Sequence, residues 1–235
     1  MTKLRTLMIN FLKRPDWLYL GLSLLIFYVW PDLDLSITDF FYSAEDHFFL
    51  KNLYWVQMSY WLFAKLPWVL IPLLTMFWLL AQQKTASRMA LFLLMSILLG
   101  PGLLVNGLAK EKMGRARPVT IEQYGGTQHF TGPLQVAQEC EHNCSFTSGH
   151  AAMAYAVIGL AWALQRRYLL WLGIFVGSLA GVGRILQGGH FFSDVLFSFW
   201  ITYFSTLLIA KIFDLELRIS SAKKPMLLGP VLVGV

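Results

Sequence analysis

Residues 168–212 read YLLWLGIFVGSLAGVGRILQGGHFFSDVLFSFWITYFSTLLIAKI, two long apolar runs joined by a short polar turn. Crossing the hydrocarbon layer of a bilayer takes roughly 20 apolar residues, and each run approaches that length. Gly188 and Gly189 permit a tight connection between them. The stretch therefore predicts two transmembrane helices, 168–186 and 190–212.

The rest of the chain extends this pattern. Of its 235 residues, 57% are hydrophobic and only 14% are charged, which excludes an ordinary soluble domain. We expect an all-α, polytopic membrane protein that forms a single domain over residues 1–235. The six predicted spans are 16–31, 66–82, 88–108, 149–165, 168–186 and 190–212. No small-residue cleavage site follows the first apolar run, so we predict no cleavable signal peptide.

Most basic residues lie on one side of the six predicted spans. These residues are Lys3, Arg5, Lys13, Arg14, Lys84, Arg88, Arg166, Arg167, Lys211, Arg218, Lys223 and Lys224. The positive-inside rule then predicts that both termini are cytoplasmic. The acidic loop 32–50 and the loop 109–148 fall outside. Because the net charge of +6 comes largely from segments that flank spans, we expect membrane lipids rather than nucleic acid as partners.

Two further segments have a less defined pattern. Residues 52–65 mix aromatic and polar positions, which indicates either an interfacial helix or an outward extension of the second span. The tail 225–235 is too short to span a bilayer and contains two prolines. We assign the tail no function.

Cys140 and Cys144 lie in the outer loop 109–148. In an oxidising compartment this pair favours a disulfide that would stiffen the approach to the following polar segment. Two free thiols are the alternative. A zinc site that includes Glu141 and His142 is disfavoured, because no second ligand pair follows at metal-site spacing.

Three polar segments, 110–118, 145–150 and 184–194, carry the side chains suited to chemistry, and all three are predicted at the outer face. Cations on the side that the positive-inside rule disfavours indicate an anionic ligand. Lys110 supplies a point charge, and Arg117 supplies a bidentate fork for phosphate oxygens.

The second segment begins the predicted span 149–165. Ser148 is a favoured N-cap immediately before Gly149 and His150. A helix start offers free N–H groups and the positive end of a dipole, which suit a phosphate. Gly149 removes the Cβ that would block close approach, and His150 could protonate a leaving alkoxide. Plain helix capping beside an incidental histidine is the alternative.

The third segment places Arg184 at the end of one predicted helix and His190 at the start of the next. Asp194 follows four residues later, so both side chains would share a helical face. The carboxylate would fix the tautomer of His190 and leave its other ring nitrogen free as a nucleophile. An ordinary His–Asp pair is the alternative. Together the three segments indicate cleavage of a phosphate ester through a histidine nucleophile.

In the same order, the three segments resemble the signature of the type 2 phosphatidic acid phosphatase superfamily. That signature is Lys-x6-Arg-Pro, then Pro-Ser-Gly-His, then Ser-Arg-x5-His-x3-Asp. Here it reads Lys110-x6-Arg117-Pro118, Thr147-Ser148-Gly149-His150 and Gly183-Arg184-x5-His190-x3-Asp194. Thr147 replaces a proline, and Gly183 replaces a serine, which would remove one hydrogen bond to the phosphate.

The resemblance implies a lipid phosphatase with a helical-bundle core that needs no metal or cofactor. His190 would attack phosphorus and form a phosphohistidine, Asp194 would orient His190, and His150 would protonate the leaving group. The phosphate would be held by Lys110, Arg117, Ser148, Gly149 and Arg184. We expect the protein in a bacterial inner membrane, with its active site in the periplasm and a phosphorylated lipid as its substrate.

A narrower resemblance points to the bacterial lipid A 4'-phosphatases. It rests on residues 100–106, 117–123, 144–146 and 187–194. Undecaprenyl diphosphate and phosphatidylglycerophosphate are alternative substrates, and a lipid phosphotransferase is an alternative enzyme. A transporter is disfavoured because the ionisable residues gather at one face. An inactive lipid-binding protein is disfavoured because His150, His190 and Asp194 are all present.

Overall fold

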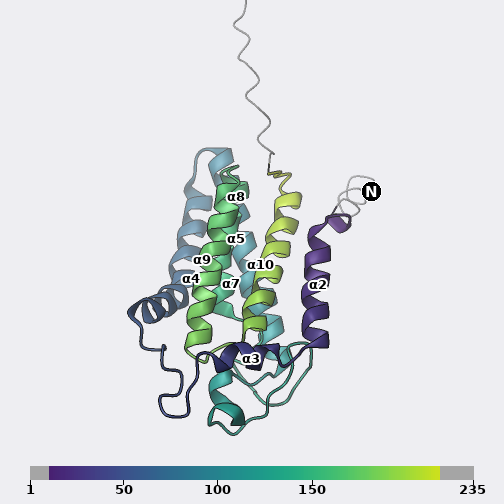
Figure 1. The fold of residues 1–235 in the computed structure, drawn as a ribbon. Coiled ribbons are helices and arrows are strands. Elements are labelled where there is room, and N and C mark those ends of the chain that lie inside the picture. The colour runs from purple at the N-terminus through teal and green to yellow at the C-terminus, as the bar shows by residue number, and fades with distance from the viewer. Residues whose placement is uncertain (1–10, 218–235) are drawn as a thin grey trace, which may run out of the picture.

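The computed structural model describes residues 11–217, and these residues fold as helices joined by turns and loops. Figure 1 shows the long helices side by side in one bundle, with the longest loops and the short helix α3 gathered at its lower end. We call this the loop end. The all-α class is therefore confirmed for the described residues.

The helices follow one another without a strand between them. Their bounds are α2 (Asp16–Val29), α3 (Leu33–Asp39), α4 (Tyr54–Leu80), α5 (Lys84–Ile97), the π-helix η1 (Leu98–Ala109), α6 (Lys110–Met113), the 3₁₀ turns η2 (Pro118–Thr120) and η3 (Glu122–Tyr124), α7 (Gly149–Tyr155), the 3₁₀ turn η4 (Ala156–Ile158), α8 (Gly159–Ala163), α9 (Tyr168–Leu186) and α10 (Phe192–Ile212).

The number of spans differs from the six expected. Four helical segments in residues 11–217 are long and apolar enough to cross a membrane: Tyr54–Leu80, Lys84–Thr120, Tyr168–Leu186 and Phe192–Ile212. A fifth is possible if α2 and α3, which are bent by 83°, count as one span. The predicted run 149–165 forms only the shorter apolar helix Gly149–Ala163. The six-span count is thus not confirmed.

Local chemistry explains where two of these boundaries fall. The first run ends at Val29 rather than at residue 31, since Pro31 disfavours a helical conformation in the residue before it. The second span begins at Tyr54 rather than at residue 66. Residues 54–65 therefore extend that span, and only the two residues before them lie outside it. The tail 225–235 lies outside the described residues.

Helix α7 lies inside the bundle, in contact with α4, η1, α9 and α10. Its fully buried positions are mostly small, namely Ala151, Ala152 and Ala154. The neighbouring α9 carries Gly173, Gly177 and Gly181, and a Cβ at Gly177 would lie 2.0 Å from the ring of Tyr155. Small residues at such spacing let helices approach closely. This packing fixes the first turn of α7 between the surrounding helices.

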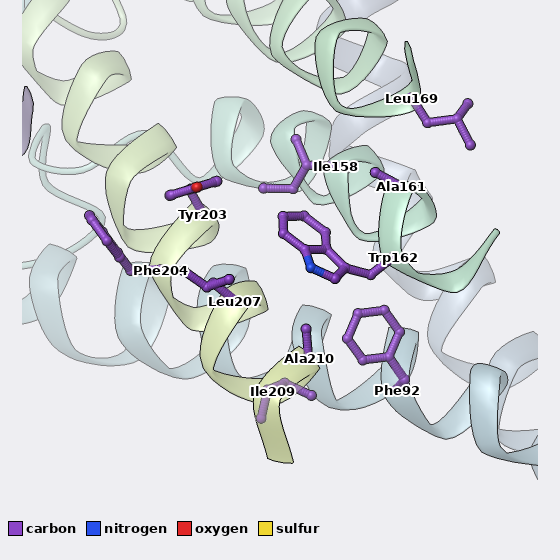
Figure 2. Packing of buried hydrophobic residues seen from close by; sticks show 10 residues of the cluster. All are labelled: Phe92, Ile158, Ala161, Trp162, Leu169, Tyr203, Phe204, Leu207, Ile209 and Ala210. Carbon is purple, nitrogen blue, oxygen red and sulfur yellow. The ribbon is translucent and has the colours of Figure 1, made fainter. Parts of the chain in front are cut away.

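The largest hydrophobic cluster joins α10 to α5, α8 and α9, as Figure 2 shows. Trp162 of α8 lies near Phe92 of α5 and the buried residues of α10 that follow Tyr203. The side chains of Phe92, Trp162 and Tyr203 are all less than 10% exposed. Close van der Waals packing of this kind is what holds helices together in a bilayer, and it anchors the helix that carries Asp194.

Candidate active site

The three polar segments meet at the loop end of the bundle. The amide of Val119 donates to the carbonyl of Gly188 over 2.9 Å, which joins the first segment to the third. The amide of Ser148 donates to the carbonyl of Asp194 over 3.3 Å, which joins the second to the third. Residues far apart in the chain therefore lie together at this end of the bundle.

His190 lies fully buried in the turn between α9 and α10, two residues before α10 begins. It does not share a helical face with Asp194, because Phe191 between them has an extended backbone. Its Nδ1 is 2.7 Å from the carbonyl of Ser145 and 3.6 Å from Asp194 Oδ2. A carbonyl can only accept, so Nδ1 carries the proton and Nε2 keeps its lone pair.

The environment of His190 favours its neutral form. Burial lowers the pKa of His190 well below its usual value, and the nearby cations act in the same direction. The nearby Asp194 carboxylate opposes this shift without cancelling it. A neutral imidazole with a free Nε2 is the form that can act as a nucleophile.

Asp194 is fully buried and accepts hydrogen bonds from three groups. Its Oδ2 accepts from Ser145 Oγ over 2.5 Å and from the amide of Phe191 over 2.8 Å, and its Oδ1 accepts from Arg115 Nη1 over 2.7 Å. The bond from Phe191 also satisfies a free N–H at the start of α10. These bonds hold the carboxylate beside the ring of His190.

Arg115 and Asp34 complete a buried ion network that the sequence did not reveal. Arg115 Nη2 is 2.8 Å from Asp34 Oδ2, and all three charged side chains of the network, including Asp194, are fully buried. Ser193 adds its amide to Asp34 over 2.9 Å and also bonds Asp34 through its hydroxyl. Buried charges are stable only when they are paired in this way. Arg115 thereby links α3 to the start of α10.

Ser148 is the N-cap of α7, as its position predicted, and its Oγ accepts from the amide of Ala151 over 3.4 Å. A Cβ at Gly149 would lie 2.4 Å from Oδ1 of Asn106 in η1. Gly149 is therefore needed for the close packing of α7 on η1. Asn106 itself donates to the carbonyl of Pro101 over 2.7 Å within the π-helix.

His150 and Arg184 both contact the ring of Tyr60, a residue of α4 that the sequence analysis did not single out. The rings of His150 and Tyr60 stack with centroids 4.8 Å apart. The Arg184 guanidinium carbon lies 4.9 Å from the Tyr60 centroid, a cation–π distance. Burial, followed by the charges of Arg184, Lys110 and Arg117, lowers the pKa of His150 to about 3. Tyr60 thus joins the second and third segments.

Arg184 is almost fully buried at the end of α9 and bonds Gln187 Oε1 through Nη1. A Cβ at Gly189 would lie 2.3 Å from Arg184 Nη2, so glycine is required for the guanidinium to occupy this place. The neighbouring Gly183, by contrast, faces α4, where a Cβ would lie 2.9 Å from Ser59 Oγ. A glycine at position 183 therefore serves the packing of α9 on α4.

Lys110 and Arg117 converge on Asn143. Lys110 Nζ donates to Asn143 Oδ1 over 3.0 Å. Arg117 donates to the Asn143 carbonyl from Nε over 3.1 Å and from Nη2 over 2.7 Å. Asn143 lies in the loop between Cys140 and Cys144, which the structure joins in a disulfide with Cα atoms 5.6 Å apart. No group of three or more metal-ligating side chains occurs within residues 11–217.

Four buried polar atoms of the three segments have no hydrogen-bond partner among the described residues. One is the Thr147 hydroxyl, and the others are His150 Nε2, Arg184 Nε and His190 Nε2. Buried polar atoms are rarely left unpaired unless a ligand or a reaction uses them. A nucleophilic nitrogen, a guanidinium N–H and a second imidazole are the groups that a phosphate ester requires.

A cavity of about 300 Å³ lies beside one of these groups, His150. Its polar end is formed by Lys110, Asn143, Gly149 and His150, and its remaining walls are mostly apolar. The apolar walls come from Phe63, Ala64, Pro67 and Ile71 of α4, Ile97 of α5, Leu98, Pro101 and Gly102 of η1, and Met153 of α7. The cavity therefore joins a cationic end to an apolar channel.

The chain is similar to known proteins over most of its length. Residues 89–218 match the PAP2 superfamily. The lipid A 4'-phosphatase of Francisella tularensis subsp. novicida is 32% identical over 197 residues, covering 79% of this chain and 88% of that protein. Those of Rhizobium etli and Rhizobium leguminosarum are 27% and 29% identical, covering 78% and 79% of this chain and 84% and 88% of the relatives. No solved structure matches at a comparable level of significance.

Proposed function

The chain belongs to the PAP2 superfamily and is a lipid phosphatase, and from this premise we propose that it dephosphorylates a lipid headgroup through a phosphohistidine at His190. One observation carries the proposal. The Nε2 atom of His190 is buried and unpaired, while Nδ1 is held by the Ser145 carbonyl. The ring is thus fixed in the tautomer that exposes a lone pair.

The reaction follows from the arrangement of the two histidines. The lone pair of His190 Nε2 attacks phosphorus, the ester P–O bond breaks, and the leaving oxygen takes a proton from His150. Water then attacks the phosphohistidine and gives a proton to His150, and the N–P bond breaks. Lys110, Arg117 and Arg184 stabilise the charge on the phosphoryl oxygens.

The phosphate itself explains how His150 becomes an acid. The pKa of His150 is low because it is buried among three cations. A bound phosphate dianion neutralises those cations, which raises the pKa and favours the protonated ring. His150 then holds a proton only when a substrate is present to receive it.

The cavity supports an amphiphilic substrate. Its cationic end suits a phosphate, and its apolar walls suit the adjoining lipid. The three relatives are lipid A 4'-phosphatases, which favours lipid A as the substrate. Undecaprenyl diphosphate and phosphatidylglycerophosphate share the chemistry of an anionic headgroup on an apolar chain and belong in the same test.

The charges at the two ends of the bundle support a location in the bacterial inner membrane. The exposed residues Lys84, at the start of α5, and Arg166 and Arg167, between α8 and α9, lie at the end opposite the active site. By the positive-inside rule this end faces the cytoplasm, and the active site faces the periplasm.

The test is phosphate release from a panel of lipid phosphates by the purified protein and its His190→Ala variant. We expect release by the wild-type chain, also in EDTA, and inhibition by vanadate. Phosphate found on an added alcohol instead of in solution would identify a phosphotransferase. Hydrolysis by the His190 variant at the wild-type rate would refute the mechanism, and a divalent metal requirement would refute metal independence.

Sidedness is tested with an impermeant thiol reagent on intact spheroplasts. Single cysteines replace His129 at the loop end and Arg166 at the opposite end, both of which are exposed. We expect the cysteine at 129 to be labelled and the one at 166 to be protected. The reverse pattern would place the active site in the cytoplasm.

A further inference from the structure

Residues 143–145 contact both the cations and the nucleophile of the site. Asn143 accepts from Lys110 through its side chain and from Arg117 through its carbonyl. Two residues later, Ser145 accepts from His190 through its carbonyl and donates to Asp194 through its hydroxyl. Neither residue belongs to the signature, whose second part begins at Thr147.

We propose that the segment 143–145, tied back by the Cys140–Cys144 disulfide, is the positioning element of the active site. Asn143 directs two cations at the phosphate, and Ser145 fixes the tautomer of His190. The inference rests on the proposed function, since it takes His190 as the nucleophile and the cations as phosphate ligands. Asn143 and Ser145 are positioning residues, because each acts through another side chain.

The Ser145 contacts explain how Asp194 acts on His190. The ring is 3.6 Å from the carboxylate, beyond a normal hydrogen bond, but 2.7 Å from the Ser145 carbonyl. The carboxylate holds the Ser145 hydroxyl over 2.5 Å, and the Arg115 carbonyl accepts from the Ser145 amide over 2.8 Å. Because Ser145 is fully buried, the bonds of its hydroxyl and amide fix the direction in which its carbonyl points.

The Asn143 contacts hold two like charges together without cancelling them. Its backbone is left-handed at φ 53°, a conformation that asparagine tolerates better than most residues. A neutral amide and a carbonyl satisfy one donor of Lys110 and two of Arg117, while the net charge remains available to a phosphate. A carboxylate at the same place would compete with the substrate.

The disulfide restrains the segment at Cys144. Cys144 is fully buried and lies between Asn143 and Ser145 in the chain, whereas Cys140 is partly exposed. A bond between them therefore fixes the one residue that connects the two halves of the positioning element. Loss of the bond frees the loop without removing any group that contacts the phosphate.

The test compares Asn143→Ala and Asn143→Asp by the Kd of vanadate, measured by calorimetry in detergent micelles. We expect binding to weaken about 10-fold for alanine and by more for aspartate, on the scale of a hydrogen bond to a charged group. Asn52→Asp, which adds a carboxylate to an exposed loop residue, should bind like the wild type. If Asn143 only maintained the fold of the loop, Asn143→Asp would raise the vanadate Kd less than Asn143→Ala. That order would overturn the inference.

Two further variants separate affinity from turnover. Ser145→Ala should lower kcat about 10-fold or more and leave the vanadate Kd unchanged, because the loosened group is the nucleophile. Cys140→Ser should raise KM and the vanadate Kd together, with an unchanged melting temperature as the sign of an intact fold. Unchanged kinetics in both variants would overturn the inference.

The same measurements distinguish this inference from the proposed function. Vanadate binding with the expected order of the Asn143 variants, but no hydrolysis of any lipid phosphate, would refute the proposed function alone. Hydrolysis of a lipid phosphate, together with a vanadate Kd that the substitutions at residue 143 leave unchanged, would refute the positioning role alone. A wild-type chain that does not bind vanadate would refute both.

Discussion

The two ends of the helix bundle differ in whether their charged side chains are buried or exposed. At the loop end, Arg115, Asp34 and Asp194 are fully buried and paired with one another. At the opposite end, Arg166 and Arg167 are exposed in the turn between α8 and α9. A larger cavity, of about 570 Å³, also lies at that end and is lined by Arg14, Arg167 and Lys211, yet it contains none of the signature residues.

The difference separates hydrated surface charges from charges that are paired inside the fold, beside the candidate site. Exposed cations at a membrane surface remain hydrated, so they set topology at little cost. A buried ion loses its hydration, and several kcal/mol per ion must be recovered from its partners. The charges retained at the loop end despite that cost form the site. Cavity size alone would have selected the wrong end.

The largest expected effect comes from replacing a buried histidine, and its control replaces an exposed histidine at the same end. His190→Ala removes the proposed nucleophile, and kcat should fall by roughly 10⁴-fold or more. The matched control is His129→Ala, whose side chain is 69% exposed and pairs with Glu122. Steady-state phosphate release should be unchanged in the control. Equal losses in both variants would contradict a special role for His190.

The second prediction compares one arginine from each end. Arg115→Met leaves Asp34 and Asp194 buried without their cation, which should cost about 3–5 kcal/mol in the free energy of unfolding. Arg167→Met, in an exposed turn, should change it by no more than about 0.5 kcal/mol. Equilibrium unfolding in mixed micelles measures both. Similar values for the two variants would show that the buried network does not stabilise the fold.

The third prediction distinguishes the wall of the substrate cavity from the lipid-facing surface of the same helix. Ala64→Trp fills the apolar channel and should raise KM for a lipid phosphate about 10-fold or more, with little effect on p-nitrophenyl phosphate. Val69→Trp, at a position that is 54% exposed, should affect neither substrate. A loss of activity on both substrates at position 64 would indicate misfolding of the site instead.

The smallest effect concerns the protonation of His190. Burial lowers its pKa in the folded protein, so only the unfolded chain binds a proton as the pH falls below about 6.5. The unfolded state then holds more protons, and stability contributed by this group decreases toward acid pH. The ¹⁵N NMR signals of the ring, assigned with His190→Asn, should show the neutral form at about pH 5.5. An imidazolium there would contradict the burial argument.

The sequence was sufficient for the class of fold, and the three segments that it singled out lie together in the structure, while the roles of their residues stay predictions. Long apolar runs have few alternatives to membrane helices, and Ser148 caps its helix as its neighbours indicate. The six-span count is not confirmed, because the apolar run at 149–165 forms a helix, Gly149–Ala163, that is shorter than a typical span. Hydropathy measures apolar length and does not detect where a helix within the run ends.

The residues that the sequence did not reveal act through tertiary contacts. Asp34 reads as one of several acids in an outer loop, and only its burial beside Arg115 separates it from the others. Tyr60 reads as one aromatic residue among many on a membrane helix, yet it stacks on His150. The signature spacing selects Arg117, and only the burial of Arg115 beside Asp34 and Asp194 reveals its role.

The bond between α3 and the start of α10 has a consequence for how the protein is made. Asp34 and Ser193 are 159 residues apart in the chain, so the first part of the network leaves the ribosome long before the last. Until the final helix enters the bilayer, Asp34 and Arg115 lack their remaining partners, and His190 has no fixed orientation. With His190 as the nucleophile, we therefore expect a chain truncated before α10 to be inactive, and activity to arise only after this helix has joined the bundle.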